Sequence, residues 1–216
     1  MKKSNLILVA GMLGMLGGIN APAMAHDHAD AAAKPASTKV VDTRLALRDL
    51  WVSHAFWVRN VARETLAGNK TAADAAEQQA VANAKSIAAA IEPFYGKAAS
   101  DKLFALLAGH YTAVKQYTEA TAADSVERQD AAQKALFANA NEIATFLSAA
   151  NPNLPKDVLL GMLLAHGGHH LQQIRQLKAG QYAEEAKTWG DMKAHMYAVA
   201  DALTGAISKQ FPDQFL

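Results

Sequence analysis

Matching residues recur along the sequence at an offset of 56 positions. Aliphatic or aromatic residues share this register at positions 47, 50 and 51, at 103, 106 and 107, and at 159, 162 and 163. One helical turn further along, the same register holds His54, His110 and His166. Repetition at a fixed period is typical of chains that use one supersecondary unit several times. The sequence therefore predicts an internal triplication, with one histidine at the same place in each copy.

The repeated unit is expected to be a helical hairpin. Apolar residues recur every three or four positions through most of the chain, which is the period of one face of an α-helix. Glycine and proline interrupt this pattern, and Thr71 with Asp74 resembles a capping box at one helix start. We expect helices over 43–66, 71–91, 100–122, 125–149, 156–180 and 182–209. Their short connections predict an all-α, six-helix bundle of three antiparallel hairpins with pseudo-threefold symmetry.

Length and composition predict a single domain, which we place at residues 42–213. About half of the 216 residues are apolar, as in an ordinary globular protein. The absence of cysteine excludes disulfides, thiolate metal sites and c-type haem attachment. Without Lys2 and Lys3, the chain has 19 basic and 20 acidic side chains and no basic cluster, so we expect no nucleic-acid partner.

The amino-terminal 25 residues are typical of a secretory signal peptide. Lys2 and Lys3 precede an apolar stretch over 6–19, and Ala23-Met24-Ala25 fits the cleavage pattern. Residues 26–41 are expected to form a flexible leader. These features predict a periplasmic or secreted protein with no membrane span after cleavage. If cleavage follows Ala25, the new terminus His26-Asp27-His28 either binds Cu²⁺ or Ni²⁺ or is a solvated tail.

The three registered histidines lie on apolar faces of the first, third and fifth predicted helices. These helices run in the same direction, so their imidazoles meet at one level if the helices surround a common axis. Buried imidazoles need partners, because even a neutral ring keeps a donor and an acceptor. A divalent transition metal satisfies three ring nitrogens at once, and Zn, Cu, Ni and Fe all suit such a set. His170, one turn after His166, is a candidate fourth ligand or a polar lining residue, whereas His169 is expected at the surface.

A second registered set accompanies the histidines. Asn83 and Asn139 share the 56-residue offset on the second helix of their units, and His195 holds the third position. We expect these three to bind or orient the bound group. The alternatives are that each histidine is satisfied separately, or that the polar centre binds a small organic ligand or a protein partner without catalysis. No general base is evident, so the sequence leaves open whether the protein is an enzyme; Arg59 is expected to be a surface residue.

The segment Leu47-Arg-Asp-Leu-Trp-Val-Ser-His54, followed by Asn139-Ala-Asn-Glu-Ile-Ala144 and Asn151-Pro152, resembles a family of small exported bacterial helical-bundle proteins. Members are mostly uncharacterised and are often labelled glycosyltransferases or acetylglucosamine transferases. The resemblance implies that the three histidines, Asn83 and Asn139 belong to a shared pattern. His195 departs from it, because the family has glutamine there. No motif in this sequence supports the transferase label.

Overall fold

The computed structural model describes residues 37–216, which belong to one compact unit. The expected signal peptide at 1–25 lies outside the described residues. So does the expected leader, except for its last five positions, 37–41. His26 and His28 also lie outside the described residues.

The described residues are helical, with no strand among them, and six long helices form the bundle. A short helix joins the second of the long helices to the third, and a 3-10 turn follows the last one. In chain order the elements are α1 (Thr38–Leu66), α2 (Lys70–Ala89), α3 (Glu92–Tyr95), α4 (Lys97–Ala122), α5 (Val126–Ala150), α6 (Lys156–Lys178), α7 (Tyr182–Gln210) and η1 (Pro212–Phe215). The expected all-α bundle of six long helices is confirmed.

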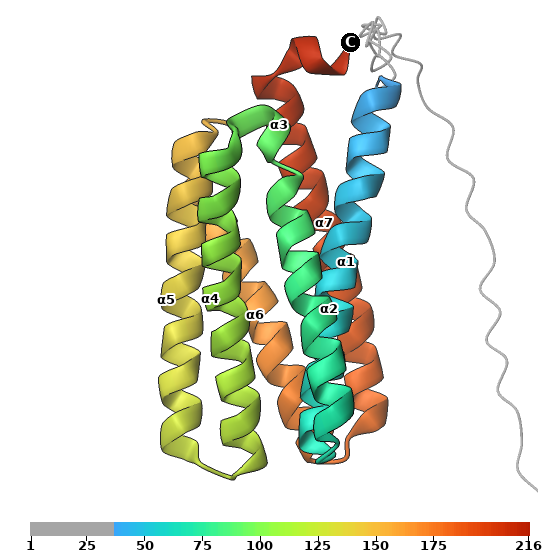
Figure 1. The fold of residues 1–216 in the computed structure, drawn as a ribbon, viewed down its shortest axis with the longest axis vertical. Coiled ribbons are helices and arrows are strands. Elements are labelled where there is room, and N and C mark those ends of the chain that lie inside the picture. Colours follow the sequence, from blue (N-terminus) through green and yellow to red (C-terminus); the bar gives the residue numbers. More distant parts are fainter. Residues whose placement is uncertain (1–36) are drawn as a thin grey trace, which may run out of the picture. The chain divides into compact units, whose positions relative to one another are not determined.

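The long helices alternate in direction, so that α1, α4 and α6 run one way and α2, α5 and α7 run the other (Figure 1). Helices α1, α4 and α6 each contact the other two. Helix α2 packs against α1 and α4, α5 against α4 and α6, and α7 against α6 and α1. The three helices that carry the registered histidines are therefore parallel neighbours around one axis.

The starts of α1, α2, α4 and α5 differ from the sequence prediction, and in α1 and α2 a side chain caps the observed start. Helix α1 begins at Thr38, inside the stretch expected to be a leader, and the Ser37 hydroxyl accepts a hydrogen bond from the Val40 amide at 3.4 Å. Helix α2 begins at Lys70, and its cap is Asn69, whose side chain accepts from the Ala72 amide. The expected capping box at Thr71 is therefore wrong, because the preceding asparagine caps the helix first.

Three turns at the same end of the bundle share one backbone form. Gly68, Asp124 and Gly180 have positive φ angles of 73°, 51° and 69°. In each turn the next amide bonds a carbonyl five residues back, at 2.9 Å: Asn69 to Glu64, Ser125 to Ala120, and Gln181 to Gln176. This is the Schellman pattern, which ends a helix and reverses the chain. The three turns lie 56 residues apart.

The core contains two apolar clusters, one on each side of the level at which the histidines lie. The first includes Leu47, Trp51, Leu107 and Leu163, before the histidines along α1, α4 and α6. The second includes Val58, Val114, Tyr117, Leu171 and Ile174, after them. The histidines therefore form a polar layer inside an otherwise apolar interior.

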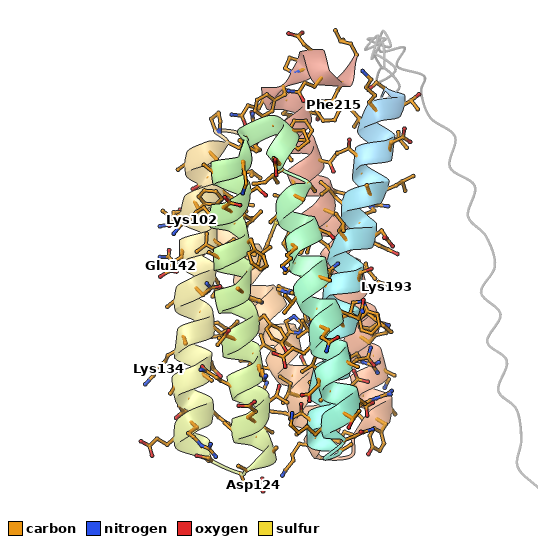
Figure 2. The ribbon with its side chains drawn as sticks, viewed as in Figure 1. Lys102, Asp124, Lys134, Glu142, Lys193 and Phe215 are labelled. Carbon is orange, nitrogen blue, oxygen red and sulfur yellow. The ribbon has the colours of Figure 1, made fainter. Side chains whose placement is uncertain are left out.

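Several charged side chains lie on the outside of the bundle. Lys102, Lys134 and Glu142 project away from α4 and α5 (Figure 2). Over residues 37–216, each helix is too short or too polar to cross a membrane.

Candidate metal centre

Four buried histidines meet at the centre of the bundle. The apolar stripe of α1 carries His54, that of α4 carries His110, and α6 supplies two residues one turn apart. Each side chain is at most 3% exposed, and one nitrogen from each ring lies within 4.8 Å of the others. We call this set the histidine centre: His54, His110, His166 and His170.

The rings of the histidine centre are close enough to share one ligand. The Nε2 atoms of His166 and His170 lie 3.2 Å apart, and the His54 and His110 ring centroids lie 5.5 Å and 5.3 Å from that of His166. A tetrahedral zinc ion with Zn–N bonds of about 2.0–2.1 Å holds its nitrogens about 3.3 Å apart. The pair on α6 already has this spacing, and one nitrogen from each of the other two rings lies within 4.8 Å of it.

Burial keeps these imidazoles neutral. It lowers the pKa of His54 to about 3, with a further lowering from His110. It also lowers the pKa of His110 to about 4, although the Asn139 side chain partly opposes that shift. The pKa values of His166 and His170 are well below the ordinary value, first because of burial and then because of the neighbouring rings. Neutral imidazoles offer the lone pairs that a metal ion needs.

Most of the ring nitrogens in the centre lack a hydrogen bond within residues 37–216. Both nitrogens of His54, both of His110 and the Nδ1 of His166 are buried without a partner. A buried polar atom without a partner costs about 1–3 kcal/mol, so native proteins rarely leave several in one place. The cluster therefore has the donor atoms and the unsatisfied bonding capacity of a metal site.

The second registered set lies beside the centre but bonds the backbone. Asn83 donates to the Leu50 carbonyl at 3.0 Å, and Asn139 donates to the Leu106 carbonyl at 3.1 Å. His195 Nε2 donates to the Met162 carbonyl at 2.9 Å. Each accepting carbonyl precedes a centre histidine by one turn. These side chains thus hold the histidine-bearing helices, and their expected role in binding or orienting the bound group stays a prediction.

One glycine makes room for this arrangement. A Cβ at Gly109 would lie 3.1 Å from the Asn139 Nδ2, so a larger residue there would push the amide away from α4. Gly109 directly precedes His110. Close approach of α5 to this part of α4 therefore depends on the missing side chain.

His169 lies outside the histidine centre. Its side chain is half-buried, and its ring centroid is 5.6 Å from that of His195. The expectation that it faces the surface is thus only partly met, but it does not contribute a nitrogen to the cluster.

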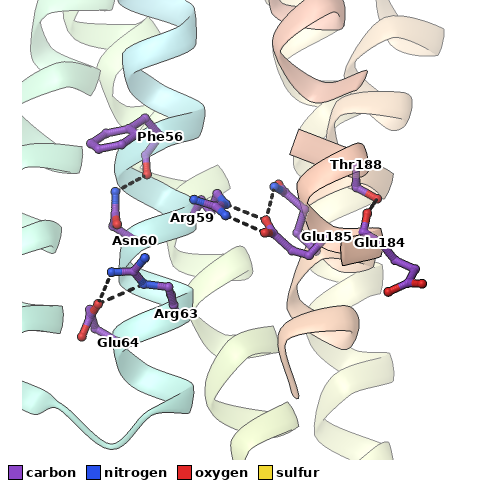
Figure 3. Close-up of polar contacts among 9 residues, drawn as sticks. Phe56, Arg59, Asn60, Arg63, Glu64, Glu184, Glu185 and Thr188 are labelled. Carbon is purple, nitrogen blue, oxygen red and sulfur yellow. Dashed lines mark hydrogen bonds and ion pairs between the residues drawn. The ribbon is translucent and has the colours of Figure 1, made fainter. Parts of the chain in front are cut away.

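A buried ion pair near the histidine centre was not predicted. Arg59 on α1 donates two hydrogen bonds of 2.5 Å to the Glu185 carboxylate on α7, and Gln173 on α6 donates to the same carboxylate at 2.9 Å (Figure 3). Glu185 is 2% exposed and the Arg59 side chain is 20% exposed. The expectation that Arg59 is a surface residue is therefore wrong. An arginine on a half-apolar helix face gives no sign of a partner 126 residues away.

In comparisons with known proteins, no family model, curated protein or solved structure matches the chain. The resemblance drawn from the sequence motifs accordingly stays a prediction.

Proposed function

We propose that this protein binds one divalent transition-metal ion through the histidine centre. The observation that carries the proposal is the meeting of four buried imidazoles, with one nitrogen from each ring within 4.8 Å of the others. Four neutral nitrogen donors without thiolate suit Zn²⁺, Cu²⁺, Ni²⁺ and Fe²⁺ rather than Mg²⁺ or Ca²⁺, which prefer oxygen.

Two features support this reading over four separately satisfied core histidines. The ring nitrogens mostly lack hydrogen bonds within the described chain, so internal bonding does not explain their burial. Two of the ligands also come from one helix at i and i+4, a spacing that suits chelation by a helix. A bound cation would take one nitrogen from each ring, so that one ion bonds all four side chains.

The 56-residue register supports a triplicated hairpin as the origin of the centre. The three left-handed turn residues at 68, 124 and 180 keep this offset. So do the three side-chain bonds to carbonyls made by Asn83, Asn139 and His195, each spanning 33 residues. We infer that three copies of one hairpin each contribute one histidine, and that His170 is an addition in the third copy.

We further propose that the protein works outside the cytoplasm, in the periplasm or after secretion. This part rests on the signal-peptide pattern at 1–25 and on the motif resemblance to exported helical-bundle proteins. The proposal assigns metal binding and no reaction.

Metal analysis of protein purified without a polyhistidine tag tests the proposal. We expect one Zn²⁺, Cu²⁺, Ni²⁺ or Fe²⁺ per chain after loading and dialysis, with higher thermal stability. The double variant H54A/H110A should lose this ion, whereas H169A, a matched control on α6, should keep it. A metal-free protein that none of the four ions stabilises would refute the proposal. Deletion of residues 26–30 distinguishes metal binding at the histidine centre from metal binding at His26 and His28. The deletion would abolish only binding at the amino terminus.

A further inference from the structure

A cavity of about 320 Å³ lies between α1, α2 and α4 and reaches the histidine centre. His54 is its only lining residue from α1 and is 2% exposed, so this ring forms the inner wall. Ala80 and Ala84 of α2 and Phe104 and Ala108 of α4 line the sides. We call it the α2–α4 cavity. Of the four centre histidines, His54 alone lines this cavity.

A divalent ion in the histidine centre would carry an uncompensated charge. All four members of the centre are imidazoles, which bind a metal ion in their neutral form, and no carboxylate belongs to the group among residues 37–216. Burying a charge without a counter-charge is costly. The loaded centre is therefore expected to attract an anion, and the α2–α4 cavity leads to it.

Tyr111 supplies a hydrogen-bond donor in this cavity. Its side chain is 7% exposed, and its hydroxyl is buried without a partner in the described part of the chain. A tyrosine hydroxyl carries its proton at neutral pH, so it can donate a hydrogen bond to an anion in the cavity. The residues 56 positions before and after Tyr111 are Ala55 and Gly167, which have no hydroxyl. Among the three registered positions, only the one in the α2–α4 cavity therefore carries this donor.

An ion pair between α2 and α4 also lines the cavity. Lys115 donates to the Glu77 carboxylate at 2.7 Å and 2.9 Å, and both side chains are about one third exposed. Since the two charges offset each other, Glu77 does not neutralise the buried centre. Without the Glu77 charge, the Lys115 ammonium would be unpaired beside the cavity and would attract an anion.

We infer that the α2–α4 cavity binds a small monocarboxylate with a short hydrocarbon tail. Its carboxylate would bind the metal ion as a fifth ligand beside the four imidazoles and accept a hydrogen bond from Tyr111, and its tail would lie against Ala80, Ala84 and Ala108. The apolar walls favour such a molecule over an inorganic anion, which has no surface to bury there. This inference rests on the proposed metal binding.

The test uses the full mature chain loaded with Co²⁺, whose visible spectrum reports a new ligand. Sodium butyrate should change the cobalt spectrum with saturation, and inorganic phosphate should have little effect. Y111F removes one hydrogen bond to a charged group and should weaken butyrate binding about tenfold. Y117F, on the same helix but bonded to Arg175 outside the cavity, should bind like the wild type.

Two further variants change the cavity in opposite directions. E77Q leaves the Lys115 ammonium unpaired beside the cavity and should tighten butyrate binding about threefold. A108F fills the cavity from a half-buried position and should abolish the butyrate response while keeping the cobalt spectrum. A loss of fold would also lose cobalt, so these outcomes are separable.

The inference is overturned if bound cobalt does not respond to butyrate, if Y111F binds butyrate as tightly as the wild type, or if phosphate binds equally well. Each of these results leaves the metal proposal intact. If the protein takes up no cobalt or other tested ion, the metal proposal fails, and this inference fails with it.

Discussion

Two buried polar clusters lie about one helical turn apart along α6, and they differ in how their polar atoms are satisfied. In the ion-pair cluster, Glu185 accepts hydrogen bonds from Arg59 and Gln173, and only the Gln173 Oε1 lacks a partner among residues 37–216. In the histidine centre, five ring nitrogens lack one in the same range. The polar atoms of the ion-pair cluster are nearly all hydrogen-bonded within the protein, whereas the histidine centre keeps ring nitrogens that can still bind a ligand.

This difference separates a structural role from a binding role. The Arg59 side chain also lies over the Trp189 ring at 5.5 Å, so the ion pair joins α1, α6 and α7 by contacts made within the protein. The histidine centre joins α1, α4 and α6 by ring contacts that leave its nitrogens free. We therefore expect the ion pair to stabilise the apoprotein and the histidine centre to stabilise only a loaded one.

The largest expected difference between the clusters is their pH dependence. A histidine in the unfolded chain titrates near 6.5, whereas the folded pKa values are about 3 for His54 and about 4 for His110. Because the unfolded chain binds more protons in this interval, stability is full above pH 6.5 and is lost as the pH falls. For these two residues together, the apoprotein should lose about 4 kcal/mol between pH 7 and pH 5.

Urea unfolding of metal-free protein at several pH values measures this loss. The contribution of the ion-pair cluster to the free energy of unfolding should change only at lower pH. Burial alone would raise the Glu185 pKa, but its bonds to Arg59 and Gln173 outweigh burial and lower it. Its stabilisation therefore persists until the pH falls below the usual carboxyl range. The double variant H54L/H110L should reduce the loss between pH 7 and pH 5 by about this amount, and His166 and His170 should still contribute to the loss that remains. An unchanged curve would contradict the assignment.

Breaking the ion pair should have the next largest effect. Glu185→Leu leaves the Arg59 guanidinium without its carboxylate, and removing one partner of a buried pair costs several kcal/mol. Because Arg59 is one fifth exposed, we expect the lower end, about 3 kcal/mol. Thermal or urea unfolding of the apoprotein at pH 7 measures it.

The matched double variant R59M/E185L removes both charges. It should recover most of that loss, since a buried pair replaced by apolar residues is often neutral. Equal destabilisation by the single and double variants would show that packing, and not the unpaired charge, dominates.

The smallest expected effect has the opposite sign. His54→Leu removes two ring nitrogens that have no partner and places an apolar side chain of similar size between the two core clusters. The metal-free variant should be more stable than the wild type by about 1–2 kcal/mol at pH 7, measured by urea unfolding. It should also lose most of the stabilisation that Zn²⁺ gives to the wild type. Destabilisation of the metal-free variant would mean that the ring is satisfied in the apoprotein.

The presence of each long helix was predictable from local sequence patterns, but the exact residues at which the helices begin and end were less predictable. The apolar period located all six long helices because each buries one face and keeps the other polar. The start of α2 was missed because Asn69 and Thr71 both carry capping side chains, and the sequence does not rank them. Helix α3 was missed because its four residues are too few to show a period.

The candidate site was predictable in its members but not in all of its contacts. The 56-residue register and the i,i+4 spacing of His166 and His170 indicated the histidine centre from the sequence alone. The roles of Asn83 and Asn139 were less predictable, because an amide beside an imidazole can also bond a nearby carbonyl, as both do here. The α2–α4 cavity left no sequence signal, since Glu77, Tyr111 and His54 come from three helices.

The sequence by itself determined the helices, the short connections between them and the face on which each histidine lies. These are local properties, set by side-chain period and by the few residues that accept a left-handed turn. Only the tertiary structure decided that four imidazoles meet within reach of one ion, that Arg59 finds Glu185, and that a cavity opens onto His54. Those facts depend on which helix packs against which, and packing joins residues that the local pattern treats as independent.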